Sequence, residues 1–161
     1  MSTVHALEGN VFEMTVAGEN LKRAWQRVKA NKGAAGCDEV SGIEFPAWAR
    51  AHWPTVKSQL MAGKYQPQAV SRVWIPKAHG GRRTLGIPSL AGRVIQQAIA
   101  QVLGPVFEGQ FSDYSYGFRP GRNAHQAVKR VREYFRRGLR AVVDIDLAAF
   151  FDSVNHDVLM C

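Results

Sequence analysis

Two aspartates near the end of the chain have the spacing of a metal-binding strand. Asp144 and Asp146 lie two residues apart in the apolar run 141–147, and Asp152 follows. Successive side chains of a β-strand point to opposite faces, so a strand here would place Asp144 and Asp146 on one face. Such carboxylates are costly unless a cation lies beside them. Because Mg²⁺ is usually held by one or two carboxylates plus substrate phosphates, we predict a Mg²⁺ site at Asp144 and Asp146. A surface strand with solvated aspartates is the alternative.

Charged residues are unevenly distributed along the chain, which has 21 Lys+Arg, 13 Asp+Glu and a formal net charge of +8. The segment from Lys64 to Phe107 contains no acidic residue, and the segment from Arg119 to Arg140 contains eight basic residues and one acid. From Ala141 onward there are four aspartates and no Lys or Arg. Basic surfaces attract phosphate backbones with strongly salt-dependent affinity, and clustered carboxylates can hold a catalytic metal. The distribution therefore favours an enzyme that acts on a polyphosphate backbone.

Composition and cysteine usage indicate a globular intracellular protein. The chain has 161 residues, 46% of them hydrophobic, which is enough to form a core as one domain or as part of a larger one. The charge-free run Val94–Phe107 is too short to span a bilayer and contains Pro105. No signal peptide is evident, and Cys37 and Cys161 lack metal-ligand spacing. We expect a cytoplasmic, bacterial-type location and no membrane partner.

Hydrophobic periodicity and capping residues predict four helical regions, one hairpin and one strand. The helices are expected at 21–28, at 45–60 with a new helix starting at Pro54, at 90–103 after a Ser89 cap, and at 124–135 after an Asn123 cap. The strands are expected at 69–75 and 82–87 around a turn at 79–81, and at 141–147. In the last helix, the residues expected to face inward are Ala124, Ala127, Val128, Val131 and Phe135.

The predicted hairpin carries two cations on opposite arms of its turn. Lys77 and Arg83 are six residues apart, with Gly80 and Gly81 between them. Cations on facing arms can close over one anionic ligand, and glycines let the backbone approach a phosphate closely. A solvated edge hairpin that uses its charges against aggregation is the alternative.

Aromatic and basic residues alternate in the loop 115–122, and the helix after it is strongly basic. Aromatic rings can stack on bases or sugars, while Arg119 and Arg122 can bind phosphates. The alternative is an ordinary loop that turns Tyr116 and Phe118 into the core. The helical residues expected to contact RNA or DNA are Lys129, Arg130, Arg132 and Arg136. A plain solvated face is the alternative.

Four ordered segments together carry a family resemblance. They are residues 31–36, 73–88, 115–122 and 144–152. Over about residues 20–161, the chain resembles the N-terminal half of group II intron-encoded reverse transcriptases, the maturase-type proteins. The resemblance implies an α+β fold, the fingers and partial palm of a right-hand polymerase, with helices packed with a β-hairpin and a palm strand. We expect a weakly structured N-terminus at 1–18, fingers and the start of the palm at 19–140, and a truncated first catalytic palm strand at 141–161.

The resemblance also implies roles for individual residues. Asp146 matches the family's catalytic, Mg²⁺-binding aspartate. Lys77 and Arg83 match the fingers residues that contact the incoming triphosphate. Phe151 matches the aromatic residue that crowds the sugar 2′ position and favours deoxynucleotides, and Arg119 matches a template–primer contact.

The implied activity is RNA-directed DNA polymerisation, with two Mg²⁺ ions in the complete enzyme. The implied partners are an RNA template or intron RNA, a DNA or RNA primer, and dNTPs, with a homodimer or the remainder of the polymerase as protein partners. Right-hand polymerases also need an aromatic-x-Asp-Asp hairpin, and the chain contains no Asp-Asp dipeptide. We therefore expect residues 1–161 alone to be inactive. The alternative function is a non-catalytic, maturase-like RNA-binding module or an inactive truncated fragment.

Overall fold

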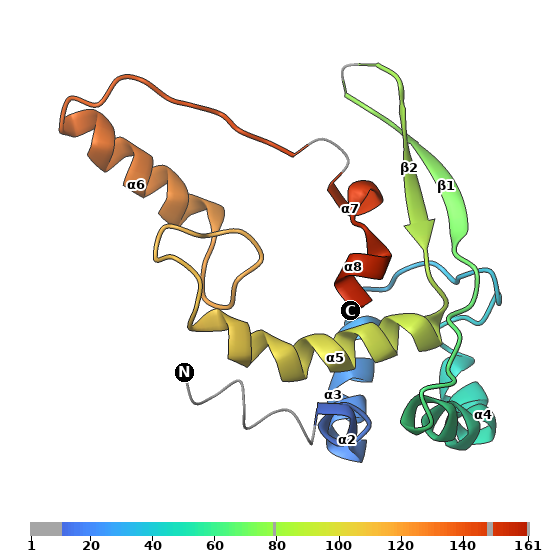
Figure 1. The fold of residues 1–161 in the computed structure, drawn as a ribbon. Coiled ribbons are helices and arrows are strands. Elements are labelled where there is room, and N and C mark those ends of the chain that lie inside the picture. The colour runs from blue at the N-terminus through green and yellow to red at the C-terminus, as the bar shows by residue number, and fades with distance from the viewer. Residues whose placement is uncertain (1–10, 79, 148–149, 161) are drawn as a thin grey trace. The chain divides into compact units, whose positions relative to one another are not determined.

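The structure, a computed structural model, describes residues 11–78, 80–147 and 150–160, except for the side chains of Phe151, Asp152 and Met160 (Figure 1). The chain divides into two compact units between Phe111 and Ser112. The first unit contains α2 (Val11–Thr15), α3 (Gly18–Ala30), α4 (Phe45–Met61), β1 (Ser71–Pro76), β2 (Arg82–Ile87) and α5 (Leu90–Glu108). The second contains α6 (Ala124–Arg136), α7 (Phe150–Ser153) and α8 (His156–Met160). This mixture of helices with a two-stranded sheet confirms the α+β class.

The hydrophobic core of the first unit lies between α3, α4 and α5. Ala24 of α3, Phe45 of α4 and Val94 of α5 are buried together. The ring of Phe45 lies 4.6 Å from that of Trp25 and 5.6 Å from that of Trp48, measured between centroids. The apolar spacing that predicted the first and third helices is therefore the spacing of the residues that α3 and α5 bury.

A buried asparagine joins the N-terminal helices to α5. Asn20 Nδ2 donates hydrogen bonds to the carbonyl oxygens of Thr15 (3.1 Å) and Ala98 (3.0 Å), while Gln101 Nε2 donates to Asn20 Oδ1 (2.7 Å). A buried amide is tolerated because these partners satisfy it. Thr15 and Val16 are also buried, so the expectation of weak structure is wrong for residues 11–18. Residues 1–10 lie outside the described part.

The predicted hairpin is present with a defined antiparallel register. Ser71 pairs with Ile87, and the ladder continues to Pro76 opposite Arg82. The turn closes with Lys77 N donating to Gly81 O (3.0 Å) and Gly80 N donating to Lys77 O (3.1 Å). Gly80 and Gly81 have φ of +89° and +81°, which only glycine adopts without strain. His79, within the predicted turn, lies outside the described residues.

The expectation that Pro54 starts a new helix is wrong. The helix α4 runs unbroken from Phe45 to Met61 with Pro54 inside it. Proline removes one backbone hydrogen bond and normally kinks or ends a helix. Here Trp53 packs against the core cluster and Val56 is buried, so tertiary packing on both sides of Pro54 outweighs the lost bond.

The segment 141–147 is not a strand. In the described part of the chain only β1 and β2 pair, and residues 141–147 are exposed and without regular structure. A strand needs a neighbour to bond its N–H and C=O groups, and no described segment provides one. The expected palm strand is therefore corrected to an unpaired stretch, followed by α7. Residues 148–149 and 161 lie outside the described part.

The apolar side of α6 is also not buried as predicted. Asn123 caps the helix as expected, since Gln126 N donates to Asn123 Oδ1 (3.0 Å) and Asn123 N donates to Gln126 Oε1 (3.0 Å). Yet Val128, Val131 and Phe135 are 41–51% exposed. Amphipathic spacing shows which side of a helix is apolar, but a second element must cover that side. Among the described elements of the second unit none does.

No helix in the described ranges combines the length and apolarity needed to cross a lipid bilayer.

Gly36 lets the loop after α3 lie against the start of α5, which yields a stability prediction. A Cβ at Gly36 would lie 2.6 Å from Ser89 Cα and 2.9 Å from the Pro88 carbonyl carbon. Ser89 caps α5 by accepting a hydrogen bond from Gly92 N (3.2 Å), so this backbone cannot shift freely. We expect Gly36→Ala to lower the free energy of unfolding by about 1–3 kcal/mol in urea denaturation.

The matched control for that variant is Gly42→Ala in the same loop. Nothing lies within 4 Å of a Cβ built at Gly42. This control is expected to change the unfolding free energy by less than about 0.5 kcal/mol. Equal urea midpoints for the two variants would show that the loop does not need glycine at position 36.

Candidate nucleotide and nucleic-acid interface

Lys77 and Arg83 lie on the same face of the hairpin. Arg83 pairs with Ile75, and Lys77 follows Ile75 by two residues, with its N–H bonded to Gly81 O. Lys77 is the first residue after β1. Extending the alternation of the strand by this one residue places Lys77 and Arg83 on one face as diagonal neighbours, with their Cα atoms about 7–8 Å apart. Both are exposed, and neither has an ion-pair partner in the described part of the chain. Two unneutralised cations so placed can bind a polyphosphate.

The arginines of the loop 115–122 hold the loop together as well as carrying charge. Arg119 Nη1 donates to the carbonyl oxygens of Ser112 (2.6 Å) and Ser115 (3.0 Å). Arg122 Nη2 lies 3.4 Å from Asp113 Oδ1, and the Arg122 guanidinium carbon lies 5.6 Å from the Tyr116 ring centroid. These contacts keep both guanidinium groups at the loop surface in fixed positions. Whether they also meet nucleic acid stays a prediction.

Arg130 lies among the aromatic residues of the same unit. Its guanidinium carbon lies 5.4 Å from the Tyr114 ring centroid, and its Nη1 lies 2.9 Å from Glu133 Oε2. A side-chain hydrogen bond with Tyr116, followed by the charge of Glu133, raises the pKa of Arg130 above its usual value. Tyr116 contacts Arg122 and Arg130 and is not simply turned into a core, as the alternative had it. Arg130 therefore anchors the loop to α6 and is less available for contact with nucleic acid than the other cations of this helix.

Two tyrosines outside the sequence prediction complete this cluster. Tyr114 and Tyr134 lie 6.5 Å apart between ring centroids. Partial burial, then a hydrogen bond with Tyr114, raises the pKa of Tyr134 above its usual value. Phe118, by contrast, is fully exposed with φ of +55°. The high density of Tyr and Arg in residues 114–134 was the only sequence signal for this cluster.

A row of cations runs along the open side of α6. Lys129, Arg132 and Arg136 line a shallow hollow together with His125 and Val128. Spacings of three and four residues place these cations about one helical turn apart on one side. Among the described residues none of the three has an ion pair. We call Lys129, Arg132 and Arg136 the α6 basic row; it is the part of the predicted nucleic-acid surface left free by the structure.

Asp144 and Asp146 are exposed on the unpaired stretch before α7. Asp146 Oδ1 accepts a hydrogen bond from Leu147 N (2.9 Å). Within the described ranges no group of three His, Cys, Asp or Glu side chains is close enough to hold a metal ion. The oxygen donors suit Mg²⁺, which is usually held by one or two carboxylates together with substrate phosphates and waters. The side chains of Phe151 and Asp152 lie outside the described ones.

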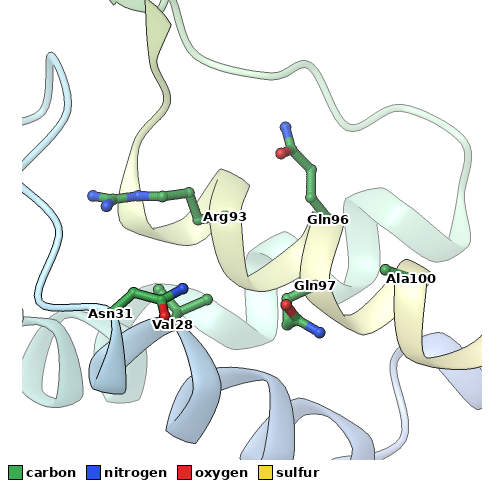
Figure 2. A pocket seen from close by; sticks show the side chains of 6 residues that line it. All are labelled: Val28, Asn31, Arg93, Gln96, Gln97 and Ala100. Carbon is green, nitrogen blue, oxygen red and sulfur yellow. The ribbon is translucent and has the colours of Figure 1, made fainter. Parts of the chain in front are cut away.

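A further basic residue, Arg93, has a structural role beside a pocket between α3 and α5. The pocket is lined by Val28, Asn31, Arg93, Gln96, Gln97 and Ala100 (Figure 2). Arg93 extends away from the two glutamines, toward the loop that follows α3. Its Nη2 donates to Ala34 O (2.5 Å). Arg93 therefore holds that loop against α5, and nothing in its sequence position indicated this.

Comparison with known proteins places these features in a family context. The family model described as "Reverse transcriptase (RNA-dependent DNA polymerase)" matches residues 75–161, which include the hairpin cations, the loop 115–122, α6 and the aspartates. The chain is 37% identical over 149 residues to "Protein YkfC" of Escherichia coli (strain K12), covering 88% of this chain and 39% of that protein. It is 33% identical over 141 residues to "Group II intron-encoded protein LtrA" of Lactococcus lactis subsp. cremoris, covering 85% of this chain and 23% of that protein.

A solved structure has a similar fold. The chain titled "Partial Cas6-RT-Cas1--Cas2 complex" matches with a TM-score of 0.51 at 21% identity, covering 92% of this chain and 24% of that one. This chain thus spans well under half the length of each protein that it matches here.

Proposed function

Because the chain belongs to the reverse transcriptase (RNA-dependent DNA polymerase) family, we propose that it binds the incoming nucleotide and the RNA during RNA-templated DNA synthesis. The observation that carries this proposal is the placement of Lys77 and Arg83 on one face of the hairpin, without carboxylate partners in the described part. The sequence similarity to a group II intron-encoded protein supports an intron RNA as the nucleic acid.

The proposed reaction is nucleotidyl transfer. The primer 3′-oxygen attacks the α-phosphorus of a dNTP, the bond from that phosphorus to the bridging oxygen breaks, and pyrophosphate leaves. Lys77 and Arg83 would hold the β- and γ-phosphates and offset the negative charge that develops on the leaving group. Phe151 would lie beside the sugar and disfavour a 2′-hydroxyl, so that deoxynucleotides are selected.

Reverse transcriptases generally use divalent metal ions. We propose Mg²⁺, held by Asp146 with Asp144 as the second carboxylate. When bound, the metal supplies charge stabilisation at the reacting phosphate. Because residues 1–161 contain two such carboxylates and no Asp-Asp pair, we propose that they hold Mg²⁺ too loosely to catalyse on their own.

The α6 basic row is the proposed main contact with RNA. Its cations are exposed and form no ion pair with the residues that the structure describes, whereas Arg119, Arg122 and Arg130 already bind groups within their own unit. These three would meet RNA only with the part of each guanidinium that remains accessible. The proposed partners are template or intron RNA, a DNA or RNA primer and dNTPs, with the remainder of a polymerase or a second copy as protein partner.

A maturase-like RNA-binding role is the second candidate. The α6 basic row lies on a different unit from the hairpin cations and needs no metal to bind phosphates. One relative, "Nuclear intron maturase 1, mitochondrial" of Arabidopsis thaliana, is 37% identical over 73 residues, covering 45% of this chain and 10% of that protein. In this role the chain would bind intron RNA without nucleotide chemistry.

A primer-extension experiment with the purified chain tests the proposal in two parts. We expect residues 1–161 to bind an RNA template annealed to a DNA primer, with affinity that falls steeply between about 50 and 200 mM salt. We expect no incorporation of dNTPs in the presence of Mg²⁺, because Asp144 and Asp146 are too few ligands to fix two Mg²⁺ ions in near-octahedral geometry.

The two readouts of that experiment, binding and incorporation, test different parts of the proposal. Absence of template–primer binding at low salt would contradict the proposed role in reverse transcription. Templated incorporation that is abolished by Asp146→Ala would instead contradict the expected inactivity, and would mean that a second copy supplies the missing carboxylates.

A further inference from the structure

The hairpin has two chemically different faces. The face that carries Lys77 and Arg83 also presents Val73, Ile75 and Leu85. The register pairs Trp74 with Thr84, Arg72 with Gly86 and Pro76 with Arg82. Since side chains alternate along a strand, these residues all project from the opposite face. We call Arg72, Trp74, Arg82 and Thr84 the tryptophan face.

Trp74 differs from the other three tryptophans of the chain. Trp25, Trp48 and Trp53 pack against the core cluster, whereas Trp74 is 57% exposed. An indole ring is the largest apolar side chain, and aromatic rings on positively charged surfaces serve as stacking platforms for nucleic-acid bases. Trp74 contributes nothing to the described core, so its ring is available for a ligand.

Two arginines flank the indole ring in the pleat. Arg72 lies two residues before Trp74 on β1. Arg82 lies on β2 opposite Pro76, which is two residues beyond Trp74 toward the turn. The two arginines are thus separated by about 13 Å along the strands, at about 3.3 Å per residue. Arg72 and Arg82 are exposed, and among the described residues neither has an ion-pair partner. The tryptophan face is therefore a flat ring between two unneutralised cations.

We propose that the tryptophan face binds unpaired nucleotides of a single-stranded nucleic acid. A base would stack on Trp74, and the flanking phosphates would pair with Arg72 and Arg82. Stacking platforms within basic surfaces are the usual means of binding single strands without sequence preference. Charge complementarity selects this occupant, because a polyanion with exposed rings matches both the ring and the cations. The inference deepens the proposed function and rests on it, adding a site that Lys77 and Arg83 do not share.

The test compares oligomers that differ only in their bases. A 12-nucleotide single-stranded RNA, its DNA equivalent and an abasic oligomer with the same number of phosphates are titrated against the 161-residue chain at fixed salt. Trp74→Ala is expected to weaken binding of both base-containing oligomers on the order of 10-fold, and to leave the abasic oligomer unchanged within about twofold. Arg72→Gln combined with Arg82→Gln is expected to weaken all three, because phosphate pairing does not need the bases.

Trp74→Phe is the conservative control and should keep most of the affinity, since a smaller ring still stacks. Trp74 is exposed, so the folded state of each variant is checked by its urea midpoint, which should stay that of the wild type. Equal losses on abasic and base-containing oligomers, or no loss on either, would overturn the proposal. A change of oligomeric state in Trp74→Ala, seen by analytical ultracentrifugation, would also overturn it by assigning the face to a protein contact. If the proposal for the tryptophan face is wrong, the wild type will still bind RNA with salt-dependent affinity. If the proposed function is wrong, the wild type will not bind RNA in this way.

Discussion

Replacing the α6 basic row, Lys129, Arg132 and Arg136, by glutamate is expected to weaken RNA binding on the order of 100-fold or more at low salt. The three cations line one side of α6 without ion pairs in the described part, so each can meet a phosphate directly. Their reversal removes three attractive contacts and adds three repulsive charges. The slope of log affinity against log salt should become shallower by about 2–3, because roughly one counterion per lost contact is no longer released.

The matched control reverses three cations on another exposed helical side. Lys22→Glu, Arg23→Glu and Arg27→Glu on α3 change the net charge of the chain by the same amount, and all three residues are exposed. We expect this control to weaken binding less than about 10-fold, through long-range attraction alone. Equal effects of the two triple variants would mean that net charge, and not the α6 basic row, governs RNA affinity. Fluorescence anisotropy with one labelled structured RNA measures both.

Removing the two hairpin cations is expected to produce the second large effect. Lys77→Ala and Arg83→Ala should each lower the affinity for dATP about 10-fold, since a hydrogen bond to a charged group contributes about 1.5–3 kcal/mol. The double variant should lower it on the order of 100-fold. Affinity for dAMP should change little, because the contacts are proposed to go to the β- and γ-phosphates. Isothermal titration calorimetry with Mg²⁺ present reports both ligands.

The opposite side of the same hairpin provides the control for this prediction. Arg72→Ala combined with Arg82→Ala removes two cations from the tryptophan face, on the same two strands. We expect dATP affinity to stay within about threefold of the wild type, as only long-range attraction is lost. A loss as large as that of the Lys77 and Arg83 double variant would show that the hairpin attracts nucleotides through its total charge, without a defined site.

The two hairpin experiments also separate the two proposed sites. Variants at Lys77 and Arg83 should affect mononucleotide triphosphates, and variants at Trp74 should affect single strands that carry bases. The alternation of the strands makes this separation possible, since neighbouring residues point to opposite faces. Crossed effects would mean that one ligand spans both faces of the hairpin.

Features set by residues close together in the chain could be predicted from the sequence. The hairpin followed from a β-branched run, a Gly-Gly turn and a second run, and both glycines do adopt positive φ. The caps at Ser89 and Asn123 are present because each side chain bonds a backbone N–H three residues ahead. The position of Lys77 and Arg83 on opposite arms of the hairpin follows for the same reason, since a tight turn leaves their register little freedom. Their role as a nucleotide site stays a prediction.

Features that need a distant partner were decided only by the tertiary structure. The run 141–147 has the residues of a strand, but a strand requires a pairing partner, and among the described residues only β1 and β2 pair. The spacing of apolar residues predicted an inward side for α6, but its residues are exposed because burial depends on an element that would cover them. Pro54 stays inside α4 because the core on both sides outweighs one lost hydrogen bond. Local sequence specifies dihedral angles and the faces of an element, whereas burial and strand pairing are properties of contacts between elements.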